Sequence, residues 1–507
     1  MYKFLLCWRY LRTRYIALAS IISVMLGVAT MIVVNSVMSG FVSEMYNRLH
    51  GIFSDVVIES LCVNGFPNAQ EKMDKIREVA GDEIEAMTPA VMLPAVLAYH
   101  NGNQWISKPV QLVGIDAITQ GKVSAFSKYL QHPANRKRLS FDLRDGGYDT
   151  RDHQAGPDAH ERPQMAVAGW EHRRRRARAE AFQRSIDNRK QQAARPAGTS
   201  LPNAFDQAQP AAAEPVFDRA RFQNEGVVIG MAMACYPDAA GRPRFALLPG
   251  DDIRLYSANA SETNPEFIKR DFTIVDFYES KMSEYDSQLV FVPLDVVQDW
   301  RGMIDPATGS RMINTIQIKL KPDADGNEVR DKLRKVFSPY LFSVSTWQDK
   351  QGPLLSAVHM EIAMLNVLLF LIIAVAGFGI LAIFLMIVVE KTRDIGILKS
   401  LGASRGGVMS IFLGYGLSLG LVGSGVGLIL GLIFVRYINE IAKGLSLVTG
   451  QQIFDPQIYY FYTIPTIVEP WTIFWIVFGA LAIAVLSSIL PACRAAMLHP
   501  VEALRYE

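Results

Sequence analysis

The chain lacks the motifs by which proteins bind metals, cradle nucleotide phosphates or activate a nucleophile. Its four cysteines form no CxxC pair and no Cys/His ligand spacing, which argues against a zinc or redox site. It has no GxxxxGK[ST] phosphate loop, and the long polar segment at residues 43–360 has no nucleophile elbow. We therefore expect no catalytic residue, no metal and no cofactor in this chain.

Net charge is also nearly absent. The chain has 51 Lys and Arg against 49 Asp and Glu, a formal net charge of +2, so its overall charge does not favour nucleic acid as a partner. Hydrophobic residues make up 50% of the chain and charged residues 20%. This is too apolar for a typical soluble enzyme and too polar for a chain that lies wholly within a membrane. The composition therefore indicates membrane spans combined with a soluble domain.

Four stretches contain no charged residue over a length that can cross a bilayer. The first, residues 15–38, exceeds the about 20 residues that a transmembrane helix needs and the about 7–15 apolar residues of a signal peptide. No clear A-x-A cleavage site follows it, so we interpret it as an uncleaved anchor rather than a signal peptide. With the other three stretches, the predicted transmembrane helices are residues 15–42, 361–389, 406–436 and 471–490.

Basic residues lie before the first span, between the second and third, and after the fourth, including Arg14, Arg405 and Arg494. By the positive-inside bias, these are the cytoplasmic sides of the membrane. We therefore place residues 1–14, 390–405 and 491–507 in the cytoplasm. The large domain at residues 43–360 and the loop at residues 437–470 then lie outside it.

The middle of each span lacks ionisable residues, so the usual machinery of ion-coupled transport is not found there. The third span instead carries glycines about one helical turn apart, at Gly416, Gly420, Gly423, Gly427 and Gly431. Small residues in this pattern let a neighbouring helix approach closely. We expect ordinary helix packing along this face.

Residues 43–360 alternate strand-like and helix-like runs, which predicts a large extracytoplasmic α+β domain. Strand–helix–strand patterns occur at both ends, at residues 55–99 and 315–345, so we predict one subdomain built from both flanks and a second from the middle. Cys62 and Cys235 both lie in this domain. A disulfide is chemically permitted there, although isolated cysteines are as often simply buried.

Residues 131–224 contain few aliphatic side chains and many Arg, Asp, Gln, Ala and Pro. Because so little apolar surface does not offset the chain entropy, we predict a flexible insertion here. It contains a basic run made of Arg173, Arg174, Arg175, Arg176, Arg178, Arg184, Arg189 and Lys190. This run could bind anionic lipid or an acidic partner, but a solvated helix face is the favoured interpretation.

The segment EKTRDIGILKSLGAS at residues 390–404 joins the second and third spans and predicts a short amphipathic helix. Its apolar face comprises Ile395, Leu398 and Leu401, and the residues left for solvent are Lys391, Asp394 and Lys399. Glu390 can pair with Arg393 at i,i+3. Gly402 suits a C-terminal cap, and Ser404 can cap the next helix. Amphipathicity alone leaves two interpretations open, a helix in the lipid headgroups or a helix docked on a partner.

The same segment is similar to the cytoplasmic loop of the FtsX-like ABC permease family, which includes macrolide-exporter, cell-division and lipoprotein-releasing permeases. PACRAAMLHPVEALR at residues 491–505 resembles the C-terminal signature of that family. The resemblance implies that residues 390–405 form a coupling helix seated on a partner ABC ATPase, which would hold ATP and Mg²⁺. The coupling residues that it implies are Glu390, Lys391, Arg393, Asp394, Ile395, Gly396, Leu398, Leu401 and Gly402.

Further stretches resemble the lipoprotein-releasing branch of the family, among them RYLR at residues 9–12, IVVNSVMSGF at 32–41, GVVIG at 226–230 and IYYFYTIP at 458–465. This resemblance implies a multi-pass permease of the bacterial inner membrane with a periplasmic MacB-like domain. It implies that this domain moves when the partner hydrolyses ATP, and that the permease extracts lipoproteins from the outer leaflet of that membrane. Its implied partners are a second permease chain, identical or paralogous, a periplasmic lipoprotein carrier and the lipid bilayer. The alternatives are a mechanotransmission permease that regulates a periplasmic partner, an efflux permease and a receptor. Residues 131–224 depart from the branch, so we assign no carrier-contact residues.

Overall fold

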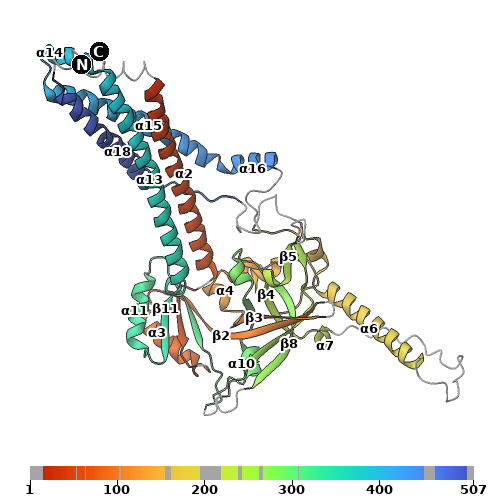
Figure 1. Cartoon of the computed structure of the whole chain (residues 1–507). Coiled ribbons are helices and arrows are strands. Elements are labelled where there is room, and N and C mark those ends of the chain that lie inside the picture. The colour runs from red at the N-terminus through yellow and green to blue at the C-terminus, as the bar shows by residue number, and fades with distance from the viewer. Residues whose placement is uncertain are drawn as a thin grey trace, which may run out of the picture. The chain divides into compact units, whose positions relative to one another are not determined.

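A computed structural model describes residues 15–52, 54–62, 64–101, 104–154, 161–193, 219–237, 243–261, 266–305, 308–449 and 463–499. The chain divides into two compact units (Figure 1). One, here called the helical unit, comprises the chain up to Tyr46 and from Gly352 onward. The other, the sheet unit, comprises residues Asn47–Gln351.

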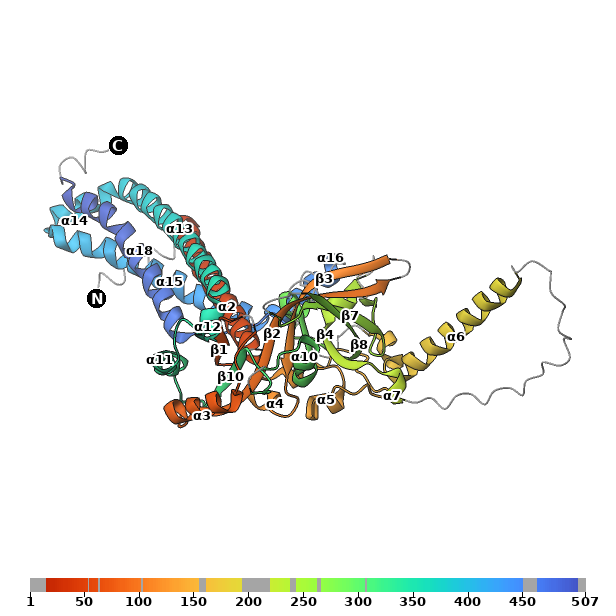
Figure 2. The same cartoon turned by 90° about the horizontal axis from the view of Figure 1, so that it is seen from below.

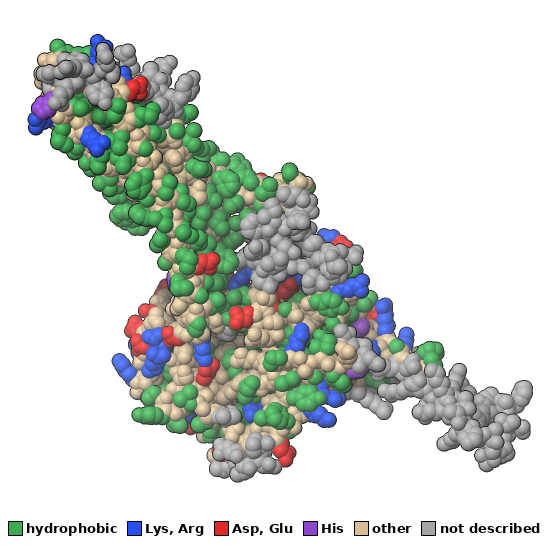
Figure 3. Space-filling model, viewed as in Figure 1, with side chains coloured by type: hydrophobic (Ala, Val, Ile, Leu, Met, Phe, Trp, Pro, Cys, Tyr) green, Lys and Arg blue, Asp and Glu red, His purple; other side chains and the backbone are tan. Residues whose placement is uncertain are grey.

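The helical unit is built on four long helices, α2 (Tyr15–Ile52), α13 (Gly352–Glu390), α15 (Arg405–Arg436) and α18 (Pro470–Met497). Each is long and apolar enough to cross a membrane, as the sequence predicts. Hydrophobic side chains cover these helices, whereas charged side chains gather on the sheet unit (Figure 3). The helices extend beyond the predicted spans. An apolar stretch predicts only the part of a helix that suits the bilayer, whereas the helix itself continues until its backbone hydrogen bonding stops. The segment predicted as a cytoplasmic tail from residue 491 therefore begins inside α18.

Two shorter helices connect the long ones. α14 (Thr392–Ser400) lies between α13 and α15, and α16 (Ile438–Thr449) follows α15 within the segment predicted as a loop at residues 437–470. Farther along that segment, the Ile467 N–H donates to the Ser36 carbonyl oxygen on α2 at 2.9 Å. A Cβ at Gly40 would lie 2.3 Å from the Pro465 carbonyl oxygen, so only glycine lets this segment lie against α2.

The sheet unit contains a nine-stranded sheet of order β11-β1-β10-β2-β3-β9-β4-β8-β7. Its strands are β1 (Val56–Ser60), β2 (Ile84–Asn101), β3 (Gln104–Ile115), β4 (Glu225–Gly230), β7 (Asp252–Ala258), β8 (Phe267–Tyr278), β9 (Leu289–Pro293), β10 (Thr315–Leu320) and β11 (Phe342–Thr346). β2 pairs with β10 through its first half and with β7 through Val96, Leu97 and Ala98. Because β2 also pairs with β3, the strands from β2 to β7 close into a ring, and β5 (Cys235–Pro237) and β6 (Pro243–Phe245) form a separate hairpin.

The two flanks of the sheet unit meet in the same sheet. β1, from the first flank, lies between β10 and β11 from the second and pairs antiparallel with both. α3 (Ala69–Ala80) and α11 (Gly326–Val336) contribute Ile76 and Leu333 to the main hydrophobic core. The domain therefore has mixed α and β content, with its core between the sheet and these helices.

The structure corrects the prediction of a flexible insertion for the described part of residues 131–224. Residues 131–154 and 161–176 pack within the sheet unit, and Leu143, Tyr148, Met165 and Trp170 are buried there. Aliphatic residues are few, but a few buried aromatic and sulfur-containing side chains combine with many polar contacts. Residues 155–160 and 194–218 of the insertion lie outside the described part.

The basic run lies on α6 (Trp170–Ala193), which extends away from the sheet (Figure 2). Two of its arginines contact the acidic side chains that precede and begin β7. The Arg173 guanidinium binds the Asp252 carboxylate at 2.9 Å, and Arg176 binds Asp251 at 2.6 Å. The first turns of the run therefore hold the helix on its own domain, a role that the sequence did not predict.

The permitted disulfide is not formed. Cys62 and Cys235 are both free thiols; Cys62 is exposed. Burial raises the pKa of the Cys235 thiol to about 11, so this cysteine stays protonated near neutral pH.

Candidate functional site

The candidate coupling site is α14, which has a cap at its C-terminus and no side-chain cap at its N-terminus. Lys391 pairs with Asp394 at 2.7 Å, an i,i+3 ion pair in the first turn of the helix. After the helix, Gly402 has φ +93°; its N–H donates to Lys399 O at 3.1 Å, and the Ala403 N–H donates to Leu398 O at 3.1 Å. This is a Schellman motif. The two connections leave α14 little freedom to move separately from α13 and α15.

The α15 end of this connection is capped as well. The Ser404 hydroxyl accepts a hydrogen bond from the Gly407 N–H at 3.1 Å, as its place in the sequence predicts. At the other side, the Thr392 hydroxyl donates to the Val388 carbonyl oxygen at 3.0 Å, which ties the start of α14 to the last turn of α13.

The residues predicted to form one apolar face of α14 are partly buried and partly exposed. Ile395 is 3% exposed and belongs to the core of the helical unit, and Gly396 is buried as well. Leu401 is instead 80% exposed, and Ile397 is 43% exposed. The two lie four residues apart and so share one outward face, which also carries the exposed Arg393. Sequence reasoning missed Ile397, although its i,i+4 spacing to Leu401 could have indicated this second face.

Lys399, predicted to face solvent, holds α14 to α18. Its ammonium donates to the carbonyl oxygens of Ala496 at 2.6 Å and Leu498 at 2.7 Å. These acceptors belong to the last residues of α18 and the one after it, where carbonyl groups have no partner within the helix. Desolvation lowers the pKa of Lys399, with a smaller contribution from the nearby Arg405. A segment of the C-terminal signature, whose role the sequence left open, thus supplies the acceptors for this contact.

A cavity of about 40 Å³ lies under α14, lined mainly by apolar side chains such as Ile387, Leu398 and Phe412. The side of α14 that faces the cavity is therefore mainly apolar, and the exposed residues Arg393, Ile397 and Leu401 lie on the outward side.

The five glycines predicted to allow close helix packing lie against two neighbouring helices, α18 and α2. A Cβ at Gly416 would meet Ser488, and one at Gly420 would meet Ala484, both on α18. A Cβ at Gly423 would meet Val24, one at Gly427 the Met25 carbonyl oxygen and one at Gly431 Ile32, all on α2. The same line of small residues thus brings α15 against α18 in its first half and against α2 in its second.

Gly427→Ile is expected to weaken the contact between α15 and α2. Its Cβ would lie 2.6 Å from the Met25 carbonyl oxygen, so backbone would have to shift, at a cost of about 1–3 kcal/mol. Gly425→Ile is the matched control, because a Cβ there meets nothing within 4 Å. Thermal unfolding of the purified chain in detergent should separate the two variants, and equal midpoints would contradict the packing described here.

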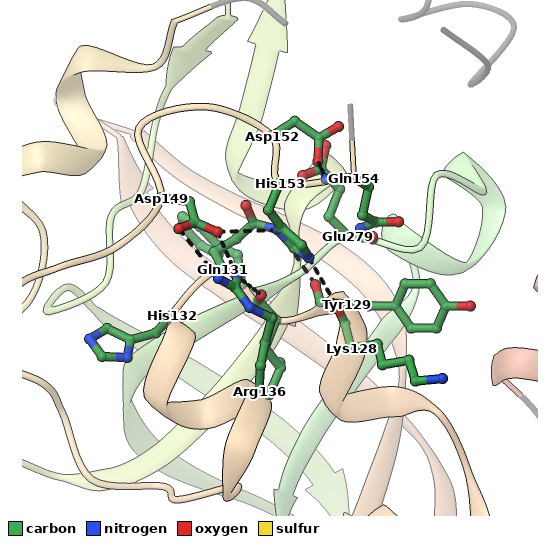
Figure 4. A network of polar contacts seen from close by, with 12 residues as sticks. Lys128, Tyr129, Gln131, His132, Arg136, Asp149, Asp152, His153, Gln154 and Glu279 are labelled. Atoms are coloured by element: carbon green, nitrogen blue, oxygen red, sulfur yellow. Dashed lines mark hydrogen bonds and ion pairs between the residues drawn. The ribbon is translucent and has the colours of Figure 1, made fainter. Parts of the chain in front are cut away.

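A cluster of buried charged side chains joins the insertion at residues 131–224 to the sheet (Figure 4). The Arg162 guanidinium binds both carboxylate oxygens of Glu279, at 2.6 and 2.8 Å, and the Lys281 ammonium contacts Glu279 and Asp152. Burial alone would raise the pKa of Glu279, but Arg162 and Lys281 hold it at about 2. The two positive charges, on Arg162 and Lys281, therefore match the two negative charges on Glu279 and Asp152.

Beside this cluster, His153 lies between two acceptors. Its Nδ1 is 3.2 Å from the Asp149 carboxylate and its Nε2 is 2.9 Å from the Lys128 carbonyl oxygen (Figure 4). Burial lowers the pKa of His153, but these two contacts outweigh it and raise the pKa above its usual value. Within the described residues no group of three or more His, Cys, Asp or Glu could hold a metal ion. Because Arg162 of the insertion binds Glu279 beside the sheet, we interpret the charge cluster as structural. The sequence indicated neither this cluster nor the contacts of His153.

Comparison with known proteins finds a family model that matches part of the helical unit. Residues 366–500 match the family described as FtsX-like permease C-terminal. The chain is 32% identical over 237 residues to the lipoprotein-releasing system transmembrane protein LolC of Xylella fastidiosa (strain 9a5c), covering 46% of this chain and 55% of LolC. It is 28% identical over 166 residues to LolE of Haemophilus influenzae, covering 33% of this chain and 40% of LolE.

A more distant likeness extends to the macrolide export ATP-binding/permease protein MacB of Bdellovibrio bacteriovorus, 27% identical over 209 residues and covering 39% of this chain and 29% of MacB. The matched region thus spans about half the length of LolC and less of the other two relatives. The chain therefore contains an FtsX-like permease domain at residues 366–500, and lipoprotein-releasing permeases are among its relatives.

Proposed function

We propose that this chain is the permease subunit of an ABC transporter that releases lipoproteins from the bacterial inner membrane. The observation that carries the proposal is α14, a short helix with a C-terminal Schellman cap and a bond to α18, whose outward face presents Arg393, Ile397 and Leu401. An exposed apolar pair beside an arginine is the kind of surface that a partner protein covers. The similarity to LolC and LolE supports lipoprotein as the cargo.

In this proposal, α14 faces the cytoplasm and receives the movement of a partner ATPase, which holds ATP and Mg²⁺. Because short connections join α14 to α13 and α15, and Lys399 bonds it to α18, a displacement of α14 moves the ends of three long helices together. The sheet unit lies outside the cytoplasm and passes the cargo to a soluble carrier. A second permease chain, identical or paralogous, completes the complex.

Apolar spans suit this cargo. Acyl chains that leave the outer leaflet would move from one apolar environment to another. Each CH₂ that is kept out of water is stabilised by about 0.8 kcal/mol. The middle of each long helix carries no ionisable residue, so the helices offer no charged path for ions. Efflux of an apolar compound is the second candidate, favoured by the likeness to MacB.

The test is reconstitution of this chain with its ATPase and a second permease chain in vesicles that contain a triacylated lipoprotein. We expect ATP-dependent transfer of the lipoprotein to a soluble carrier protein, and no transfer of a variant that lacks the acylated cysteine. Vesicles without ATP are the control. ATP turnover that exports an apolar drug without releasing lipoprotein would favour efflux, and ATP hydrolysis by the purified chain alone would contradict both candidates.

A further inference from the structure

α16 is an amphipathic helix at the end of a membrane span. Only Tyr437 separates it from α15, and Figure 1 shows it pointing away from the four long helices. Its apolar face comprises Ile438, Ile441, Leu445 and Val448, and its polar face carries Asn439, Glu440 and Lys443. Ile441, Leu445 and Val448 are 39, 50 and 84% exposed, so a row of large apolar side chains lies on the surface.

The start of α16 lies at the level where the apolar spans end. α15 and α18 are consecutive spans, so the last residue of α15 and the first of α18 lie at the same end of the helical unit. Exposed aromatic side chains mark this end, with Tyr437 54% exposed and Trp471 68% exposed. Tyrosine and tryptophan concentrate at the boundary between the acyl chains and water. A helix that turns away from the spans at this level runs along the membrane surface.

The position of α16 is fixed by its polar face. The Asn439 side-chain oxygen accepts a hydrogen bond from the Ile464 N–H at 2.8 Å. Three residues on, the Ile467 N–H donates to Ser36 O on α2, so this segment is itself held against a span. These bonds hold the start of α16 to the rest of the unit through the side of the helix that carries Asn439. Ile441, Leu445 and Val448 lie on the other side of the helix and are exposed there.

We propose that α16 lies in the lipid headgroup layer, with Ile441, Leu445 and Val448 among the upper acyl segments. A helix of this kind buries its apolar face about 5–10 Å into the boundary between headgroups and acyl chains. The opposite charges of Glu440 and Lys443 offset one another, so the helix needs no anionic lipid. Its effect is to hold the ends of α15 and α18 at a fixed depth in the bilayer.

Spin labels on the full chain test this depth. The four cysteines are first replaced by serine, and Leu445→Cys, Val448→Cys and Leu447→Cys are each labelled and reconstituted in phosphatidylcholine vesicles. Leu447 is the matched control: it is a leucine two residues from Leu445, is 85% exposed, and lies on the polar side of the helix. We expect the ratio of collisions with oxygen to collisions with a water-soluble nickel chelate to be several-fold higher at 445 and 448 than at 447.

Two outcomes would overturn the proposal. Equal access of the nickel chelate to 445 and 447 would place the helix in water. Low access of both reagents at 445 and 448 would mean that protein, such as residues 450–462, covers the face. If the labelled variants fail to insert, the unmodified chain can be crosslinked in vesicles with a lipid that carries a photoreactive group near its headgroup. Label on residues 438–449 supports the proposal, and label on the spans without any on this helix contradicts it.

Discussion

Replacing Ile397 and Leu401 together by aspartate is expected to abolish coupled transport while the chain still inserts in the membrane. Both residues are exposed, Leu401 at 80% and Ile397 at 43%, so the substitutions change the surface of the helical unit more than its core. Each apolar side chain that anchors an interface contributes about 2 kcal/mol or more. If the two add, binding of the ATPase weakens by about 4 kcal/mol, which is on the order of several hundredfold.

The measurement is lipoprotein-stimulated ATP turnover in vesicles, together with the amount of ATPase that co-purifies with the permease. Ile304→Asp is the matched control, because Ile304 is 46% exposed and lies in the sheet unit, away from the proposed docking face in the sequence. We expect that control to keep normal turnover. Unchanged stimulation in the double aspartate variant would show that the ATPase does not dock on this face of α14.

Gly396→Pro probes the same helix from its buried side. Gly396 lies in the middle of α14, where proline removes a backbone donor and costs about 3 kcal/mol. The surface residues stay unchanged in this variant, so the two experiments separate the shape of the helix from the chemistry of its outward face.

Arg162→Met is expected to cost about 3–5 kcal/mol of folding free energy in the sheet unit, because it leaves a buried charge unpaired. Arg162 and Glu279 are 9% and 6% exposed, and the guanidinium binds both carboxylate oxygens. Without Arg162, the Lys281 ammonium still contacts the carboxylates of both Glu279 and Asp152. The buried cluster then carries one net negative charge.

Two further variants test that reading of the cluster. Arg311→Met removes an exposed ion pair with Asp299 and should cost less than about 1 kcal/mol. Arg162→Met combined with Glu279→Met leaves Lys281 paired with Asp152, so the double variant should be more stable than Arg162→Met alone. Thermal unfolding of the purified full chain and the rate of trypsin cleavage within residues 131–193 report both effects. A loss for Arg162→Met no larger than that for Arg311→Met would show that the cluster does not hold the insertion.

The insertion shows why sequence reasoning failed there. Few aliphatic residues indicate disorder only if polar side chains stay in water, and here they do not. Arg162 finds Glu279 117 residues away, and Arg173 finds Asp252 79 residues away. A run of arginines looks like a solvated face until the position of their acidic partners is known. No local pattern encodes pairings at such separations.

The sequence by itself determined the four spans, the short helix between the second and third, and the glycine at the end of that helix. These are local properties, since a charge-free stretch of sufficient length suits a bilayer, and a positive φ at Gly402 follows from the turn that the chain makes there. Tertiary structure alone decided which side of α14 faces outward, that Lys399 bonds to α18, and that a buried charge cluster holds the insertion. The reason is physical: burial and ion pairing depend on residues that are distant in the chain and close in space.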